Sequence, residues 1–257
     1  MISVAIVGGA GRMGQTIARA VHDADDLSLT ALVDVTTPQE SFGAITTTTS
    51  LQDLDATTID VVIDFSTLEV ARDTIVWCLR HQRHAVIGTT GFDADELEQI
   101  RTAVRGNVGI VVAANFAIGA VLLQRFAAMA APFFTRVELI EYHHDNKVDA
   151  PSGTALETAR RIDESRREAG VATPPDPTTR ETVTGSRGAT LSGDIPVHAV
   201  RLPGLTAHQE VLFGREGEGL TLRHDAYDRS SFAAGVVHAV RQVGSHPGVT
   251  MGLDSLL

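Results

Sequence analysis

Cysteine is nearly absent from this 257-residue sequence, and basic residues are fewer than acidic ones. The single cysteine, Cys78, excludes an internal disulfide framework and any zinc cluster built from cysteines, and it suits a reducing compartment such as the cytoplasm. The 21 basic and 32 acidic residues give a net charge of -11, a poor electrostatic match to a nucleic-acid backbone or an anionic membrane. We therefore expect a cytoplasmic protein with no nucleic-acid and no membrane partner.

Lysine is also scarce, because the 21 basic residues include only one lysine, Lys147. A lysine can release its proton inside a protein and an arginine cannot, so an isolated lysine can mark chemistry that arginine does not perform. An arginine-rich composition that kept one lysine by chance explains the count equally well. The neighbours of Lys147 decide between these two explanations.

A signal peptide and a membrane span are not expected either. An apolar strand begins directly after Met1, without a basic segment or a cleavage site. The most apolar stretch, residues 107–134, opens with a β-branched run and continues as an Ala-rich segment. This pattern predicts a strand, a loop and a buried helix.

Residues 2–113 alternate short β-rich runs with amphipathic helical segments, which is typical of a doubly wound parallel sheet. The expected strands of this part are 2–7, 28–33, 61–64, 84–88 and 108–113, and we interpret the Thr run at 46–49 as a loop. After a helix over about 117–132 the expected elements are strands at 135–144, 195–202, 206–214 and 219–226 and a helix at 153–168, with a closing helix at about 229–243. The sequence thus predicts an α/β protein. A Rossmann-type dinucleotide-binding domain would comprise residues 1–115 plus 229–257, and an α+β domain with a mixed sheet would comprise residues 116–228.

A glycine motif follows the first expected strand. Gly9, Gly11 and Gly14 have the G-x-G-x-x-G spacing, and a helical pattern comes directly after them. Such a turn brings backbone close to a pyrophosphate and presents free N–H groups of a helix N-terminus to it. A tight turn without a ligand remains the alternative.

Asp34 lies twenty residues after Gly14, at the end of the second expected strand. An acidic residue at this distance accepts hydrogen bonds from the adenosine ribose of a dinucleotide. A 2'-phosphate beside Asp34 would meet a like charge, and the next residue, Val35, is not an arginine. We therefore expect NADH or NADPH as cofactor with a preference for NADH, although Arg12 offers partial compensation for a phosphate.

A second cluster, EYHHDNKVDAPSGTA (141–155), contains two histidines, the only lysine and a Pro-Ser-Gly-Thr turn. In an extended strand His143 and His144 point to opposite sides, which disfavours a shared metal ion, so no metal site is expected. A histidine followed four residues later by Lys147 offers a proton donor beside a cation. Ser152 is expected to cap the following helix, either as a simple N-cap or beside an anion held by Gly153 and Thr154.

These residues make the sequence resemble the 4-hydroxy-tetrahydrodipicolinate reductase (dihydrodipicolinate reductase) family over essentially its whole length. VGGAGRMG resembles the nucleotide motif of that family, DFS (64–66) and GTTGF (88–92) its nicotinamide-side loops, and AANFAIG (113–119) its interdomain segment. Residues 141–155 resemble its specific signature E-x-H-H-x-x-K-x-D-x-P-S-G-T. The sequence departs from the family at Ala117, where Ser is common, and has Asp145 and Asn146 before Lys147.

The resemblance implies an NAD(P)H-dependent oxidoreductase of the diaminopimelate route to lysine. Its substrate would be 4-hydroxy-tetrahydrodipicolinate, a small dicarboxylate reduced to tetrahydrodipicolinate, and the second domains would form a homotetramer. His143 would be the general acid and Lys147 the catalytic cation. The implied substrate contacts are His144, Ser152, Gly153 and Thr154. The cofactor contacts expected from the glycine motif and the resemblance together are Gly8, Gly9, Gly11, Arg12, Met13, Gly14, Asp34, Phe65, Gly88, Thr89, Thr90, Ala113, Ala114, Asn115 and Phe116.

Two other classes of function remain as alternatives. A non-catalytic dinucleotide-sensing protein would not need Lys147 beside His143. The other alternative is another two-domain reductase of aspartate-family amino-acid metabolism, such as aspartate-semialdehyde or homoserine dehydrogenase. The former would need a cysteine nucleophile, whereas Cys78 lies in a helical pattern next to Trp77.

Overall fold

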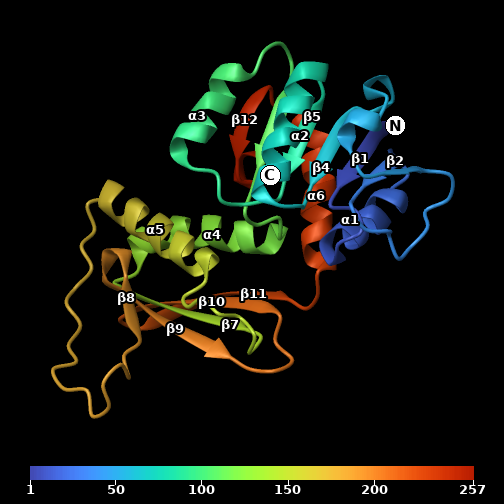
Figure 1. Cartoon of the computed structure of the whole chain (residues 1–257). Coiled ribbons are helices and arrows are strands. Elements are labelled where there is room, and N and C mark those ends of the chain that lie inside the picture. Colours follow the sequence, from blue (N-terminus) through green and yellow to red (C-terminus); the bar gives the residue numbers. More distant parts are fainter. The chain divides into compact units, whose positions relative to one another are not determined.

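The computed structural model describes all 257 residues, and the chain divides into two compact units. One unit comprises Met1–Ile118 and Arg229–Leu257, and the other comprises Gly119–Asp228 (Figure 1). The first unit therefore contains both ends of the chain.

The first unit is built on a parallel sheet of seven strands in the order β12-β6-β5-β4-β1-β2-β3. Its strands are β1 (Ile2–Val7), β2 (Leu27–Val33), β3 (Thr46–Thr48), β4 (Val61–Asp64), β5 (His84–Ile87), β6 (Gly109–Val112) and β12 (Gly248–Met251). The strand order reverses between β1 and β4, and ligands of such sheets bind at the carboxyl ends of the strands at this switch point. The predicted doubly wound parallel sheet is confirmed.

Helices cover both faces of this sheet. They are α1 (Arg12–His22), α2 (Leu68–His81), α3 (Ala94–Ala103) and α6 (Ser230–Val243), and α1 packs against α6. Successive residues of the central strands are buried on opposite faces, and Val62, Ala85 and Ile110 share a core with the fully buried Trp77 of α2. Because both faces are covered, the strands read as continuous apolar runs, which made them visible in the sequence.

Two edge strands were not predicted. The Thr run that was interpreted as a loop forms β3, which pairs in parallel with Ala31–Val33 of β2. The strand β12 adds the opposite edge by pairing with β6. Both edge strands are partly exposed and lack an apolar run, so the hydrophobic pattern gave no signal for them.

The second unit contains a mixed sheet of five strands in the order β11-β10-β7-β9-β8. Its elements are α4 (Ile118–Ala130), β7 (Arg136–His143), α5 (Gly153–Glu168), β8 (Ala189–Leu191), β9 (Ile195–Arg201), β10 (Ala207–Arg215) and β11 (Glu218–Ala226). The pair β7–β9 is parallel and the other pairs are antiparallel. This is the mixed sheet that the sequence predicted.

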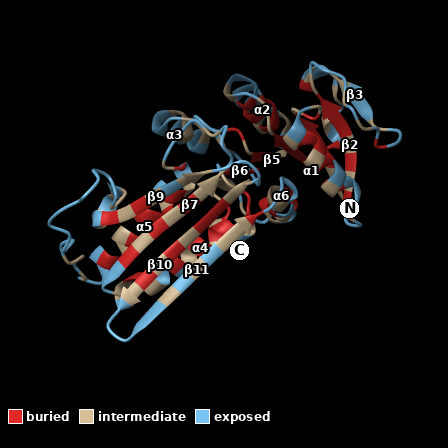
Figure 2. Cartoon of the chain, turned by 90° about the horizontal axis from the view of Figure 1, so that it is seen from below, coloured by how far each residue is buried: buried red, intermediate tan, exposed pale blue.

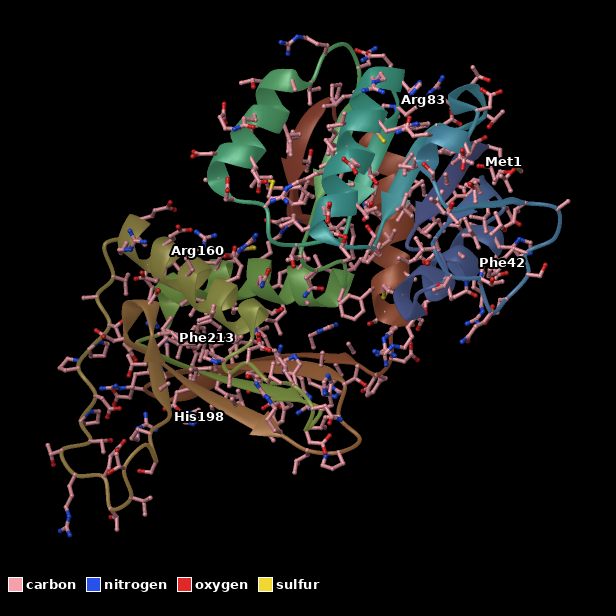
Figure 3. All side chains as sticks on the ribbon, in the orientation of Figure 1. Met1, Phe42, Arg83, Arg160, His198 and Phe213 are labelled. Carbon is pink, nitrogen blue, oxygen red and sulfur yellow. The ribbon has the colours of Figure 1, made fainter.

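The helices α4 and α5 lie along one face of this second sheet (Figure 1). Burial alternates along β7 and β10, so that Leu139, Val211 and Phe213 face the helices and form the core of the unit (Figure 2). Figure 3 places Phe213 between the helices and the sheet and His198 on the opposite side of the sheet. The alternation therefore decides which residues of β7 can reach the first turn of α5.

Short 3-10 helices complete both units, at Leu51–Asp53, Ala56–Thr58, Ala131–Phe133, Ser192–Asp194 and Asp254–Leu256. None of the helices has the length and apolar character that crossing a membrane requires.

Candidate active site

The glycine motif lies between β1 and α1, at the carboxyl edge of the parallel sheet. Gly11 is the N-cap of α1, no side chain caps this helix, and its first turn carries no acidic residue. A Cβ atom on Gly14 would come within 2.0 Å of the carbonyl oxygen of Gly8, so only glycine permits this close approach. The turn thus leaves N–H groups and the positive end of the helix dipole open to an anion, which fits the pyrophosphate of a dinucleotide.

Asp34 ends the neighbouring strand and is bonded to the same turn. One carboxylate oxygen accepts a hydrogen bond from the N–H of Ala10 at 2.9 Å, and the other accepts from the N–H and the hydroxyl of Thr36, each at 2.9 Å. Burial acts to raise the pKa of Asp34, but the hydrogen bonds from Thr36 and Ala10 outweigh it and the pKa is lowered. Asp34 therefore stays ionised beside the glycine turn. The oxygen that accepts from Ala10 can accept a further donor, whereas the oxygen that accepts from Thr36 already receives two hydrogen bonds.

Asp64, at the end of β4, is a functional candidate that the sequence analysis missed. Its side chain is fully buried and accepts hydrogen bonds from the hydroxyls of Ser66 (2.7 Å), Thr74 (2.6 Å) and Thr89 (3.0 Å). These bonds join the loop after β4 to the loop after β5. Asp64 thereby fixes the two loops whose sequences were expected to lie beside a nicotinamide.

The loops after β4, β5 and β6 meet through aromatic side chains. The rings of Phe65 and Phe116 lie 5.6 Å apart, and a Cβ atom on Gly88 would come within 2.2 Å of the Phe65 ring. The remaining predicted cofactor residues of this edge are Thr90 and Ala114, which are exposed, Ala113, which is buried, and Asn115, whose Oδ1 accepts from the N–H of Ala117. The structure thus gathers the predicted nicotinamide-side segments at one edge of the sheet.

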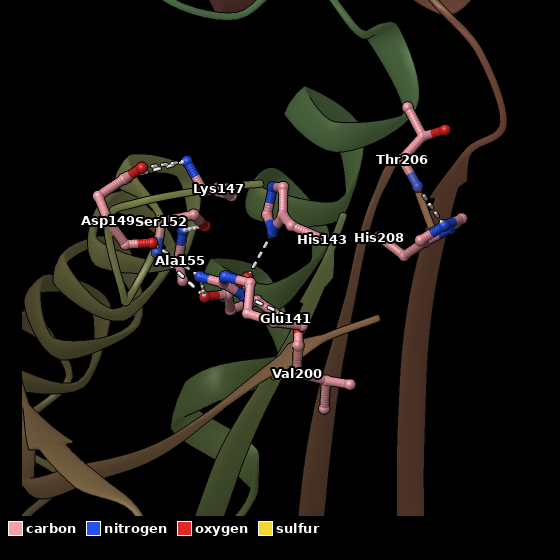
Figure 4. Close-up of polar contacts among 10 residues, drawn as sticks. Glu141, His143, Lys147, Asp149, Ser152, Ala155, Val200, Thr206 and His208 are labelled. Atoms are coloured by element: carbon pink, nitrogen blue, oxygen red, sulfur yellow. Dashed lines mark hydrogen bonds and ion pairs between the residues drawn. The ribbon is translucent and has the colours of Figure 1, made fainter. Parts of the chain in front are cut away.

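In the second unit, the cluster at 141–155 is organised around Glu141, whose role the sequence analysis did not assign. Its side chain is only 1% exposed, and its Oε2 contacts Nδ1 of His143. Arg201 of β9 binds both of its oxygens, with Nη2–Oε1 at 2.7 Å and Nη1–Oε2 at 2.9 Å (Figure 4). His143, on the same strand and the same face, is thereby held at the end of β7.

Lys147 lies in the loop that follows β7. Its Nζ is 2.7 Å and 2.9 Å from the two carboxylate oxygens of Asp149 (Figure 4). This hydrogen bond lowers the pKa of Asp149. The negative partner of the only lysine is therefore Asp149 and not Asp145, whose effect could not be assigned from the sequence.

His144 does not continue the strand as expected, because β7 ends at His143. Its carbonyl oxygen accepts a hydrogen bond from the N–H of Lys147 at 3.1 Å, which closes a turn, and its side chain is exposed. The strand geometry that was used to separate the two histidines therefore applies to His143 alone.

The predicted N-cap of the following helix is confirmed. Ser152 is the N-cap of α5, and its hydroxyl accepts a hydrogen bond from the N–H of Ala155 at 3.2 Å. Gly153 and Thr154 form the first turn, at the positive end of the helix dipole, and this turn contains no acidic side chain. The N–H of Ser152 itself lies 3.3 Å from Oε1 of Glu141, which places this turn beside His143.

Burial lowers the pKa of three histidines, His84, His143 and His224. At His143 the cations Lys147 and Arg201 add to this effect and Glu141 opposes it. In the unfolded chain each histidine returns to a pKa of about 6.5. As the pH falls below about 6.5 the unfolded chain therefore binds protons before the folded chain does.

We expect the free energy of unfolding to decrease as the pH falls from about 7 to about 5.5, with a slope corresponding to no more than three protons taken up. Denaturant titrations across this range measure it. An unfolding free energy that stays constant or rises would contradict the assignment of lowered pKa values to these three partly buried histidines.

Together, a parallel sheet with an open glycine turn and a histidine–lysine cluster beside a helix N-terminus define a nicotinamide-dependent oxidoreductase. Family models described as "Dihydrodipicolinate reductase, N-terminus" and "Dihydrodipicolinate reductase, C-terminus" match residues 2–116 and 119–257. The chain belongs to the dihydrodipicolinate reductase family, as the sequence motifs predicted. Cys78 is buried with a pKa that burial and the charge of Asp64 raise, so it is no candidate nucleophile.

Relatives match over their whole length. The 4-hydroxy-tetrahydrodipicolinate reductases of Nocardia farcinica and Corynebacterium efficiens are 50% and 47% identical to this chain, over 100% of this chain and 98% of each relative. A solved structure of dipicolinate-bound dihydrodipicolinate reductase from Paenisporosarcina sp. TG-14 is 41% identical, with a TM-score of 0.91 over 100% of both chains. The match therefore includes both units.

Proposed function

We propose that this enzyme reduces 4-hydroxy-tetrahydrodipicolinate to tetrahydrodipicolinate in the diaminopimelate route to lysine. The substrate loses its 4-hydroxyl group as water and gains a hydride from NADH or NADPH and one proton, so that tetrahydrodipicolinate, water and the oxidised cofactor are the products. The observation that carries the proposal is the cluster of His143, Lys147 and the first turn of α5, gathered in one unit of a chain that matches this family from end to end. Dipicolinate, a planar dicarboxylate, is the ligand of the related Paenisporosarcina structure. A dicarboxylate of similar size suits a site with one cation and one helix N-terminus.

The binding roles follow from charge. The N–H groups of Gly153 and Thr154 hold one substrate carboxylate, with Ser152 and His144 beside them, while the Lys147 ammonium binds a second negative group. Lys147 must exchange its present partner, Asp149, for the substrate. Ionic competition of this kind favours a doubly charged ligand over a singly charged one.

The cofactor residues proposed for the first unit are those of the glycine turn, Asp34 and the loops around Phe65, Thr89 and Phe116. When bound there, a nicotinamide cofactor supplies the hydride that reduces the substrate. His143 then delivers a proton from Nε2 to the reduced substrate, because its Nδ1 is occupied by Glu141. The Glu141 carboxylate stabilises the charged imidazolium until the proton leaves.

The test is the oxidation of NADH by the purified protein, followed by absorbance, when freshly made product of dihydrodipicolinate synthase is added. We expect oxidation that depends on this substrate and that dipicolinate inhibits. A protein that binds NADH but shows no substrate-dependent oxidation would refute the proposed reaction and favour a sensor.

We propose a preference for NADH over NADPH, which is supported by the ionised Asp34 beside the glycine turn. Asp34→Ala is expected to weaken NADH binding about tenfold or more, since hydrogen bonds to a charged group are lost, and to change NADPH binding little, because a like charge near the 2'-phosphate is removed as well. Binding titrations with both cofactors measure this.

Thr36→Val is the matched control for Asp34→Ala, because it removes a hydrogen bond that holds the Asp34 carboxylate without removing the charge. It should affect both cofactors about equally. An equal loss of both cofactors in Asp34→Ala would mean that Asp34 only supports the turn through Ala10.

We also propose a cytoplasmic homotetramer assembled through the second unit. Support comes from the sheet face away from α4 and α5, where Ile140 and Tyr142 are only partly buried within this chain. Light scattering in solution is expected to give the mass of four chains, and a monomer at micromolar concentration would contradict this assembly.

A further inference from the structure

The ion pair between Glu141 and Arg201 contacts every segment of the proposed substrate site. Glu141 bonds the ring of His143 and lies 3.3 Å from the N–H of Ser152 at the start of α5. Arg201 donates from Nη2 both to Glu141 and, at 2.8 Å, to the carbonyl oxygen of Asp149 in the loop that carries Lys147. One buried carboxylate and one guanidinium thus join a strand, a loop and a helix N-terminus.

We propose that Glu141 and Arg201 act as a pair of positioning residues, which holds the proton donor, the cation-bearing loop and the carboxylate-binding turn in one catalytic arrangement. Neither residue needs to touch the substrate for this role. The proposal rests on the proposed function for its catalytic consequence, but the arrangement itself can be tested without turnover.

The first consequence concerns the proton of His143. A carboxylate acceptor at Nδ1 fixes the tautomer that carries its hydrogen on Nδ1, and this directs Nε2 away from Glu141. After Nε2 has given up a proton, the neutral ring that remains is the tautomer that Glu141 stabilises. Without Glu141 the ring is free to rotate and to hold its hydrogen on either nitrogen.

The second consequence concerns the loop between β7 and α5. Arg201 also donates from Nη1 to the carbonyl oxygen of Val200 at 2.8 Å, so its guanidinium is fixed to its own strand and reaches across to Asp149. The planar guanidinium of arginine can donate to both oxygens of a carboxylate and, at the same time, to a carbonyl oxygen. A lysine ammonium on its flexible side chain does not reproduce this arrangement. Arg201 therefore ties the loop that carries Lys147 to Glu141 on the strand that carries His143.

A purely structural salt bridge is the competing explanation. The Nε of Arg201 is buried without an acceptor, so the pair is not optimised for stability alone. The same strand offers an internal comparison, since Glu138 on the other face of β7 also pairs with an arginine, Arg187, and a histidine, His198. Glu138 contacts none of the segments of the site.

The experiment compares Glu141→Gln and Arg201→Lys with the control Glu138→Gln. We expect kcat of Glu141→Gln to fall about 10²-fold, the scale for losing a group that orients an acid–base residue, while the Kd for NADH stays unchanged. For Arg201→Lys we expect a smaller fall in kcat and weaker binding of dipicolinate, because the loop loses its contact with the guanidinium. Glu138→Gln should match the parent protein in kcat, in the Kd for NADH and in the binding of dipicolinate.

The tautomer of His143 gives the readout that a structural salt bridge would not move. Ring ¹⁵N chemical shifts should show the hydrogen on Nδ1 in the parent protein and a larger population with the hydrogen on Nε2 in Glu141→Gln. The charged groups that act on the ring are Glu141, Lys147 and Arg201. If Glu141→Gln does not fold, the double variant Glu141→Gln/Arg201→Gln, which leaves no unpaired buried charge, takes its place.

An unchanged tautomer together with a kcat within about threefold of the parent in folded variants would overturn the positioning role. A parent protein that fails to reduce the proposed substrate would refute the proposed function instead, and the tautomer and dipicolinate measurements would still decide the role of the pair.

Discussion

Lys147→Arg is expected to lower kcat by about 10²-fold, the usual scale for losing a positioned catalytic group, while the fold and the Kd for NADH remain unchanged. A guanidinium is larger than an ammonium, keeps its proton at any usable pH and directs its donors in a fixed plane. The side chain of Lys147 is only 20% exposed, so a larger group has little room beside Asp149. Steady-state kinetics at saturating substrate measure the effect.

The matched control for this substitution is Arg160→Lys, the reverse exchange at an exposed ion pair of α5. It should leave kcat unchanged. Near-normal turnover in Lys147→Arg would show that any cation suffices at this position and that the scarcity of lysine is an accident of composition.

His143→Gln is expected to lower kcat about 10²-fold or more, because glutamine can occupy the site beside Glu141 but cannot deliver a proton. Binding of NADH and of dipicolinate should change little, which separates loss of chemistry from loss of the site. Titrations and single-turnover kinetics distinguish these steps.

The double variant His143→Gln/Lys147→Arg should lose less than the product of the two single losses if both residues act in the same step. Strictly multiplicative losses would indicate independent roles. Substitution of the exposed, unassigned His22, as His22→Gln, serves as a control for histidine loss elsewhere and should leave kcat unchanged.

Much of the fold was visible in the sequence because the buried strands and amphipathic helices carry strong periodic signals. The apolar run of β1 followed directly by Gly9, Gly11 and Gly14 predicted the strand, turn and helix that the structure contains. The position of Ser152 directly before a helical pattern predicted that it would be the N-cap of the following helix, α5. By contrast, the edge strand Thr46–Thr48 depends on pairing with a neighbour and leaves no pattern of its own.

The partners of the site were harder to predict because they come from distant parts of the chain. Arg201 lies 60 residues after Glu141, and only the parallel pairing of β7 with β9 brings them together. In the sequence, Glu141 was identified only as part of the signature at 141–155. A buried carboxylate cannot be told from an exposed one by sequence until its partners are known. The hydroxyls around Asp64 likewise come from three separate elements.

The ion pairs of the proposed site also determine how it responds to the charge of its substrate. Without a ligand, Glu141 and Arg201 neutralise each other, as do Lys147 and Asp149, so the region around His143 is electrically balanced. A dicarboxylate brings two negative charges into this balanced region and draws Lys147 away from Asp149. We therefore expect a bound dicarboxylate to favour the protonated form of His143, so that substrate binding and proton uptake are thermodynamically linked.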